Sequence, residues 1–371
     1  MQRNHSIDAI RGTLLLIMSI NHFIWITVGW ADIQYITLQP FGQVGAAEGF
    51  IFISGLMVGL VYSTYNSQVM RQKLHQRAKQ LYIYHMSAIA GLLVVGALYI
   101  HFVPPVHTFY DNVFPGLMEN KALALAASAT LIHKPAYFDI LPMYVIFLLI
   151  APIVLKQLSK GRMIEILVVS LITWLSSRFI NLSEMLTPLF PDSELNTGYF
   201  SLLAWQLLFV IGICLGYRAQ HQPINWFKYR SVTALVAITA LVIFVLNRNV
   251  LGQYGIHQGT LYELADKPLI GWLRAVNLLL LVYLFAWLLH RKPNALAFKP
   301  LALIGRNSLQ VFTWHYLVIF TLAPATLGYL DFQPSLTISL MIVACSLLIP
   351  PLWRERRKTN KLSIEKVRHS G

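Results

Sequence analysis

The sequence is poor in charge and has almost no cysteine. Only 12% of its 371 residues are Asp, Glu, Lys or Arg, whereas an average soluble domain has about 25%. Hydrophobic residues make up 56% of the chain, and the mean hydropathy is +0.59. This composition excludes an ordinary water-soluble domain. The only two cysteines, Cys214 and Cys345, lie inside apolar segments, so we expect no disulfide, metal site or thiol chemistry.

Long apolar runs organise the chain. About ten of them approach the ~20 residues with which a helix crosses a bilayer. These runs span residues 8–30, 43–65, 81–103, 137–156, 163–181, 200–217, 231–247, 268–290, 301–322 and 335–352. The run at 121–133 is too short to cross, and we expect a re-entrant or interfacial segment there. The sequence therefore predicts an all-α, polytopic transmembrane bundle over residues 1–352, followed by a basic cytoplasmic tail at 353–371.

The basic residues indicate how the bundle is oriented. The formal net charge is +14, but these residues stand in short clusters between apolar runs, which argues against nucleic-acid binding. With the N-terminus inside, 21 of the 29 Lys and Arg residues fall in cytoplasmic segments and four in outer ones. This asymmetry follows the positive-inside rule. It predicts a multi-pass protein of the cell inner membrane with both termini in the cytoplasm, and with the lipid bilayer as its surroundings.

The first apolar run contains ionisable residues at helical spacing. Arg11 and His22 are eleven residues apart, which places them within about 20° on one helix face and about 16 Å apart along the axis. Asp8, three residues before Arg11, can pair with it. Two simpler interpretations are open: Arg11 extends to lipid headgroups, and His22 is a packed core residue. The alignment favours a functional pair, since an ionisable group inside a membrane is costly without a role.

Two further segments place polar residues at the depth of His22. In the run at 301–322, His315 lies about as far from the inner end as His22 does from its own. Arg306, nine residues earlier on that run, is expected on the opposite face and can simply cap the inner end. Glu48 enters the membrane from outside, within reach of His22, where a carboxylate would orient the imidazole as a general base. We therefore predict His22, Glu48 and His315 as catalytic candidates.

Other polar residues are candidates for substrate contacts. In the outer half, guanidinium groups suit a carboxylate, although each can also extend to the membrane surface. These outer candidates are Arg178, Arg274, Asp139 and Gln206. On the inner side, a cationic stretch suits the phosphates of a cofactor, although it also satisfies the positive-inside rule. This stretch comprises Arg71, Lys73, Arg77, Lys79, Tyr82 and His85.

Several blocks together resemble a known family. IDAIRGTLLLIMSINHF is similar to the opening of acyltransferase-3 type membrane acyltransferases, with Arg11 and His22 at the family's spacing. The closer resemblance is to the OpgC family of glucan-modifying membrane proteins. It rests on GAAEGFIFISG, RAKQLYIYH, FDILPMYVIFLLIAP, LLAWQLLFVIG and IGRNSLQVFTWH. The resemblance implies transfer of a succinyl group from cytoplasmic succinyl-CoA to hydroxyls of a periplasmic glucan, with His22 catalytic and Arg11 on the coenzyme path.

These observations give one main hypothesis and two rivals. Acyl-CoA, used as a donor substrate and not as a bound cofactor, would dock from the cytoplasm on Asp8, Arg11 and the cationic stretch. An envelope glycan would enter from outside. A transporter of an acidic solute or polysaccharide precursor is the first rival, with Arg178 and Arg274 as anion ligands. A non-catalytic subunit of an envelope complex is the second, and it leaves the aligned Arg11 and His22 unexplained.

Overall fold

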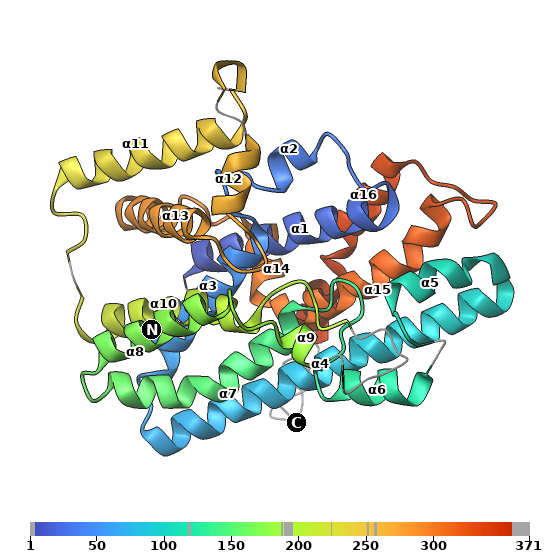
Figure 1. The fold of residues 1–371 in the computed structure, drawn as a ribbon, viewed down its shortest axis with the longest axis horizontal. Coiled ribbons are helices and arrows are strands. Elements are labelled where there is room, and N and C mark those ends of the chain that lie inside the picture. The colour runs from blue at the N-terminus through green and yellow to red at the C-terminus, as the bar shows by residue number, and fades with distance from the viewer. Residues whose placement is uncertain are drawn as a thin grey trace, which may run out of the picture. The chain divides into compact units, whose positions relative to one another are not determined.

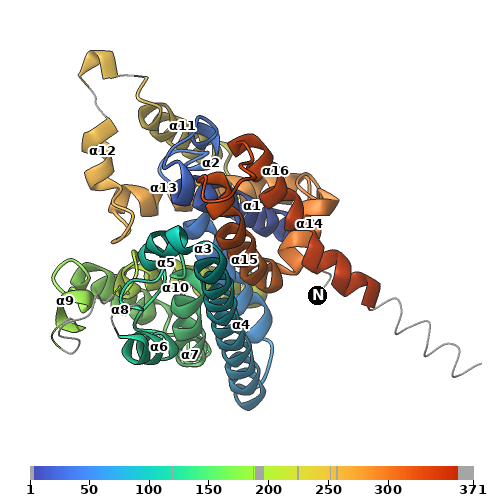
Figure 2. The same cartoon turned by 90° about the vertical axis from the view of Figure 1, so that its right-hand side faces the viewer.

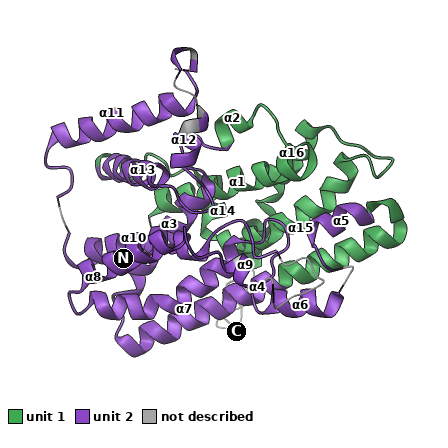
Figure 3. Ribbon diagram, viewed as in Figure 1, with its two compact units in different colours: residues 1–37, 87–106, 291–371 green, residues 38–86, 107–290 purple. Residues whose placement is uncertain are grey.

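The computed structural model describes residues 4–117, 120–186, 188, 196–223, 225–250, 252–255 and 258–357 (Figure 1). Throughout these residues the regular structure is helical, without a strand. Seven helices within this part of the chain are long and apolar enough to cross a membrane. The predicted all-α fold is therefore confirmed. The chain divides into two compact units that interleave along the sequence, so neither unit is a continuous segment (Figure 3).

The first unit comprises residues 1–37, 87–106 and 291–371 and is built around α1 (His5–Thr27). Helix α1 packs against α14 (Lys299–Arg306), α15 (Ser308–Thr326) and α16 (Leu336–Ser346), as Figure 2 also shows. Asn4 caps its start, since the side-chain oxygen accepts from the backbone N–H groups of Ser6 and Ile7. The short α2 (Gln34–Thr37) and the 3₁₀ turn η1 (Pro104–Val106) complete this unit together with the end of α4.

The second unit comprises residues 38–86 and 107–290. Helix α10 (Leu202–His221) is at its centre and packs against α3 (Ala46–Tyr62), α7 (Ile140–Leu158) and α8 (Met163–Ser176). The remaining elements are the first part of α4 (Ser67–Phe102), α5 (His107–Val113), α6 (Lys121–Ala129), α9 (Leu182–Leu186), α11 (Arg230–Asn247), η3 (Gly252–Tyr254), α12 (Gln258–Leu264) and α13 (Trp272–Arg291).

Glycines bring α3 and α10 into backbone contact. A Cβ atom at Gly55 would overlap the carbonyl oxygen of Phe209, and one at Gly212 would overlap that of Phe52. Gly59 and Gly216 repeat this reciprocal arrangement one turn further along. Small residues four apart allow membrane helices to approach closely, and these four glycines have that role between α3 and α10.

Each of the ten predicted spans contains a helix, but two boundaries were wrong. Helix α4 begins at Ser67, fourteen residues before the predicted span at 81–103, and its 36 residues extend about 54 Å. The added stretch has no Gly or Pro, so strong helix formers continue the helix through polar sequence. The predicted run at 301–322 is broken at Asn307 into α14 and α15.

Two further predictions concern the short apolar run at 121–133 and the basic tail at 353–371. The segment predicted as too short to cross forms the nine-residue α6. Near the C-terminus, helical structure continues beyond α16 to Arg357, giving the candidate span Leu336–Arg357. The predicted tail at 353–371 therefore begins within a helix, and its residues 358–371 lie outside the described part of the chain.

Candidate functional site

The two histidines predicted at equal depth come together in the first unit. His315 Nε2 lies 3.4 Å from His22 Nδ1, and the two ring centroids are 5.6 Å apart. His315 is 1% exposed, whereas His22 is half-buried and so is partly accessible. The Trp25 ring, one turn along α1, lies 6.3 Å from the His22 ring. Helix periodicity placed both residues at one depth, and the packing of α15 on α1 makes them a pair.

The hydrogen bonds of this pair define its tautomers. His315 Nδ1 contacts the backbone carbonyl oxygen of Phe312. A carbonyl oxygen can only accept, so His315 Nδ1 carries the proton and, in a neutral imidazole, Nε2 accepts. His22 Nδ1–H then donates to His315 Nε2, which leaves His22 Nε2 as the acceptor nitrogen. A ring nitrogen oriented in this way suits a general base.

A second polar contact joins the same two helices. The Arg11 guanidinium donates from Nη2 to the Ser308 hydroxyl at 2.7 Å. Arg11 precedes His22 on α1, and Ser308 precedes His315 on α15, so the two helices run in the same direction. At Gly12 a Cβ atom would overlap the Leu301 carbonyl oxygen, and at Gly305 it would overlap that of Asp8. This close approach of α1 and α14 fixes the base of α15, where Ser308 stands, while Asp8 is buried in the same interface.

Glu48 has a different partner from the one predicted. In the second unit its Oε1 accepts from Arg274 Nη1 at 2.6 Å, and the two side chains are 0% and 2% exposed. Arg274 also donates to the carbonyl oxygens of Ala265 and Gln43. A Cβ built on Gly45 lies 3.3 Å from Glu48 Oε2 and 3.9 Å from Lys267 Nζ. Glu48 therefore has two cations near it, and Arg274, predicted as a substrate ligand, has a carboxylate partner within the protein.

Two further predicted substrate ligands also have partners inside the second unit. Gln206 exchanges hydrogen bonds with Ser170, donating to its carbonyl oxygen at 2.8 Å and accepting from its hydroxyl at 2.7 Å. These bonds join α8 to α10. Asp139 is buried before the first turn of α7, and its Oδ1 accepts from the backbone N–H of Tyr199 at 2.9 Å. Both residues thus hold helices or loops in place.

The predicted cofactor residues on α4 separate into exposed and buried groups. The side chains of Arg71, Lys73 and Lys79 are exposed, and that of Arg77 is half-buried. Tyr82 donates to the carbonyl oxygen of Ala129 at 2.9 Å and so attaches α4 to α6. His85 is fully buried, with its ring 6.0 Å from that of Phe138. Burial removes His85 from the exposed cationic surface for which it was predicted.

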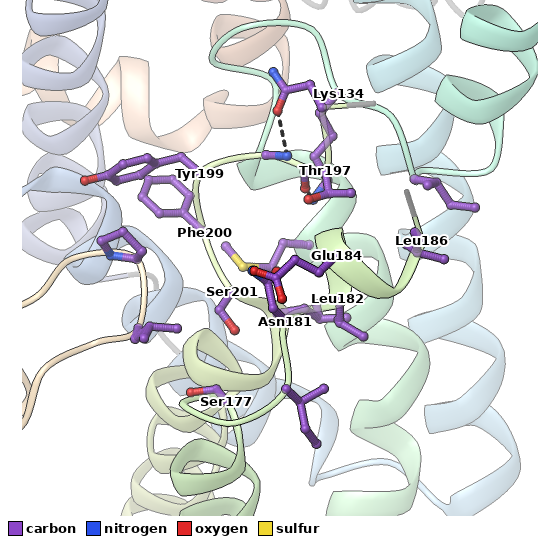
Figure 4. A pocket seen from close by; sticks show the side chains of 18 of the residues that line it. Lys134, Ser177, Asn181, Leu182, Glu184, Leu186, Thr197, Tyr199, Phe200 and Ser201 are labelled. Carbon is purple, nitrogen blue, oxygen red and sulfur yellow. Dashed lines mark hydrogen bonds between the residues drawn. The ribbon is translucent and has the colours of Figure 1, made fainter. Parts of the chain in front are cut away.

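The second unit also contains a cavity of about 680 Å³ (Figure 4). Its walls come from the ends of α8 and α10, from α9 and from the loops beside them. Arg178 is the one predicted substrate ligand that lines it. The other polar lining residues are Thr130, Lys134, Ser177, Asn181, Glu184, Asn196, Thr197, Tyr199 and Ser201. Sequence reasoning missed this cavity, because its walls are loops and helix ends with no periodic pattern.

These features define an all-helical protein with helices able to cross a membrane and a pair of histidines, one buried and one half-buried, between α1 and α15. A family model described as OpgC protein matches residues 3–359. This match covers nearly the whole sequence, so the chain belongs to the OpgC family, and the resemblance inferred from the sequence is confirmed. No curated protein and no solved structure matches the chain.

Proposed function

We propose that this chain is a transmembrane O-acyltransferase of the inner membrane. It would move an acyl group from cytoplasmic acyl-CoA to hydroxyls of a periplasmic glucan. We take the acyl group to be succinyl because the chain belongs to the OpgC family. The observation that carries this proposal is the His22–His315 pair, because it orients one partly accessible imidazole as a base. Membership of the OpgC family and a set of apolar helices both fit a membrane enzyme of this kind.

In the proposed reaction, His22 acts on the acceptor hydroxyl. Its Nε2 takes the hydroxyl proton while the oxygen attacks the carbonyl carbon of the thioester. The carbon–sulfur bond then breaks, and the coenzyme sulfur leaves with the proton returned from His22. The products are one ester and one free thiol, so no further reactant is needed. His315 holds the His22 ring in the required tautomer throughout.

We assign the donor to the end of α1 that carries Arg11. Its guanidinium is held by Ser308 through one nitrogen, and planar donors of this type suit phosphate groups. The exposed Arg71, Lys73 and Lys79 of the second unit remain a separate prediction for phosphate binding, made from the sequence. The aligned positions of Arg11 and His22 on one helix then place donor recognition and chemistry about 16 Å apart along α1.

Transfer of a radiolabelled succinyl group from succinyl-CoA to unsubstituted periplasmic glucan, catalysed by the purified, reconstituted protein, tests this function. We expect labelled glucan with the parent, and a loss of about 10²–10⁴-fold with His22→Ala, the range for removing a general base. His101→Ala, an exposed histidine on α4, is the matched control and should retain parental transfer. Parental transfer by a folded His22→Ala protein would contradict the mechanism, and uptake of label into vesicles without acylation would favour a transporter.

A further inference from the structure

The cavity in the second unit has the size of a small-molecule site. Its volume of about 680 Å³ lies inside the ~300–1,000 Å³ range of ligand pockets. Tyr199 and Phe200 stand on one side of it, and the α9 residues Leu182 and Leu186 on the other (Figure 4). The cavity is thus enclosed by an aromatic wall and an aliphatic wall, with polar groups between them.

The charges around the cavity compensate one another. Lys134 donates to the Thr197 carbonyl oxygen at 2.5 Å, and the charge of Asp139 acts on it. Arg178 lies over the Trp174 ring, 5.2 Å from its centroid. The Glu184 carboxylate accepts from the Asn181 amide at 2.8 Å. Of the charged residues that line the cavity, two are cations and one is a carboxylate, and the buried Asp139 offsets the charge of Lys134. The charges in and next to the cavity therefore balance, which does not favour an anionic ligand.

The aromatic wall presents an accessible ring. Tyr199 is 58% exposed, and its ring centroid lies 5.3 Å from that of Phe200. Phe200 in turn packs on the buried Trp205, with centroids 4.2 Å apart. The face of an aromatic ring is electron-rich and attracts the slightly positive C–H groups of a ring-shaped ligand. A firmly packed Phe200 beside an exposed Tyr199 gives such a ligand a rigid surface.

The polar groups between the walls both donate and accept. Amides and hydroxyls predominate, and they come from separate elements: Ser177 follows α8, Asn181 precedes α9, and Ser201 caps α10. Asn196 accepts from the Gly198 N–H at 2.9 Å, which orders the loop on that side. Mixed donors and acceptors suit hydroxyl groups, which use both functions.

We propose that this cavity is a carbohydrate subsite that binds one uncharged sugar unit of the acceptor glycan. Tyr199 stacks on the sugar ring, and Asn181 and Arg178 hydrogen-bond its hydroxyls. The assignment rests on the proposed function for its choice of carbohydrate as the substrate class. A polymeric acceptor extends over many sugar units, so a subsite can hold the chain without touching the reacting atoms.

Direct binding of a short unsubstituted β-glucan oligosaccharide to the full-length protein in nanodiscs tests the subsite. Binding is measured by saturation-transfer NMR and by titration, without acyl-CoA. We expect Tyr199→Ala and Asn181→Ala to weaken binding about tenfold or more, the effect of losing about 1.4 kcal/mol of contact. Asn294→Ala, the same change at an exposed site outside the cavity, is the matched control and should bind as the parent does. His22→Ala should also bind normally.

The outcomes separate the subsite from the enzyme. Binding by the parent that the cavity variants lose supports the subsite even if no acyl transfer is found, in which case only the proposed function fails. Parental acyl transfer with parental glucan affinity in both cavity variants overturns the subsite and leaves the enzyme intact. Binding of free succinate, and not of glucan, in a manner abolished by Arg178→Ala would likewise overturn it. Thermal unfolding of each variant shows that it is folded.

Discussion

The ion pair between Glu48 and Arg274 gives the sharpest prediction from the structure. Replacing Glu48 with Gln preserves the shape of the side chain and an oxygen that can still accept a hydrogen bond, but removes the charge. Arg274 is then left buried without a carboxylate, and Lys267 loses the same partner. We expect Glu48→Gln to lower the free energy of unfolding by about 3–5 kcal/mol, the cost of breaking a buried pair from one side.

The geometry supports that magnitude. At an effective dielectric constant of about 20, unit charges about 4 Å apart attract by about 4 kcal/mol, and the pair here is in direct contact at 2.6 Å with both side chains buried. Because Arg274 also donates to two backbone carbonyl oxygens, it is held rigidly and cannot turn toward water. The penalty therefore cannot be relieved by a change of rotamer.

A double-mutant cycle in detergent micelles measures this coupling. Unfolding by sodium dodecyl sulfate, followed by tryptophan fluorescence, gives the stabilities of the parent, Glu48→Gln, Arg274→Met and the double variant. The double variant should be more stable than the sum of the single losses predicts, by about 1–3 kcal/mol. Glu263→Gln, an exposed carboxylate on α12, serves as the control. A Glu48→Gln protein within about 0.5 kcal/mol of the parent would refute the reasoning.

Three other perturbations follow from single contacts. His315→Gln should retain more acyl transfer than His315→Phe, since only the amide oxygen can accept from His22 Nδ1; equal rates and equal pH profiles would contradict the tautomer assignment. Gly198→Ala should destabilise the protein by about 1–3 kcal/mol in thermal unfolding. The reason is that Gly198 has φ +92° and that a Cβ atom there would overlap Asp139 Oδ1. Gly259→Ala, with open space around it, is the control. Burial lowers the pKa of His133 from 6.5. The unfolded chain therefore binds the proton first as the pH falls, so the stability that neutral His133 contributes is complete above about pH 6.5 and is lost as the pH drops toward the lowered pKa. His133→Gln should flatten that part of a plot of melting temperature against pH.

The sequence predicts the helices well because their cause is local. An apolar run of the right length forms a helix wherever it lies in the chain, so each of the ten predicted spans contains one. The alignment of Arg11 with His22 is local in the same sense, since one helix sets it. Helix breaks are harder to predict: Asn307 interrupts a run that periodicity reads as continuous, because the break depends on the packing of α14 against α1.

Contacts between distant residues were beyond such reasoning. Glu48 and Arg274 are 226 positions apart, and each had a plausible role alone: one to orient His22, the other to bind an anion. Only the packing around α3 and α13 shows that the two charges meet. The cavity was missed for a related reason, since Lys134, Asn181 and Tyr199 come from separate loops that no repeat or spacing connects.

The expectation that an ionisable group inside the membrane is costly without a role can now be refined. The buried Arg274 and the half-buried Gln206 both have hydrogen-bond partners within the protein. These partners account for their position, since an unpaired polar group in an apolar interior is costly. His22 and His315 differ from the Glu48–Arg274 ion pair, because two imidazoles bring no opposite charges together. Two apolar side chains in their place would leave no polar group to be hydrogen-bonded. Their contact, in which the Phe312 carbonyl oxygen sets the tautomer, places polar ring nitrogens inside the helix bundle, and His22 is only half-buried there. The proposed proton transfer at His22 would account for such an arrangement, whereas Leu or Phe would fill the same space without burying a polar group.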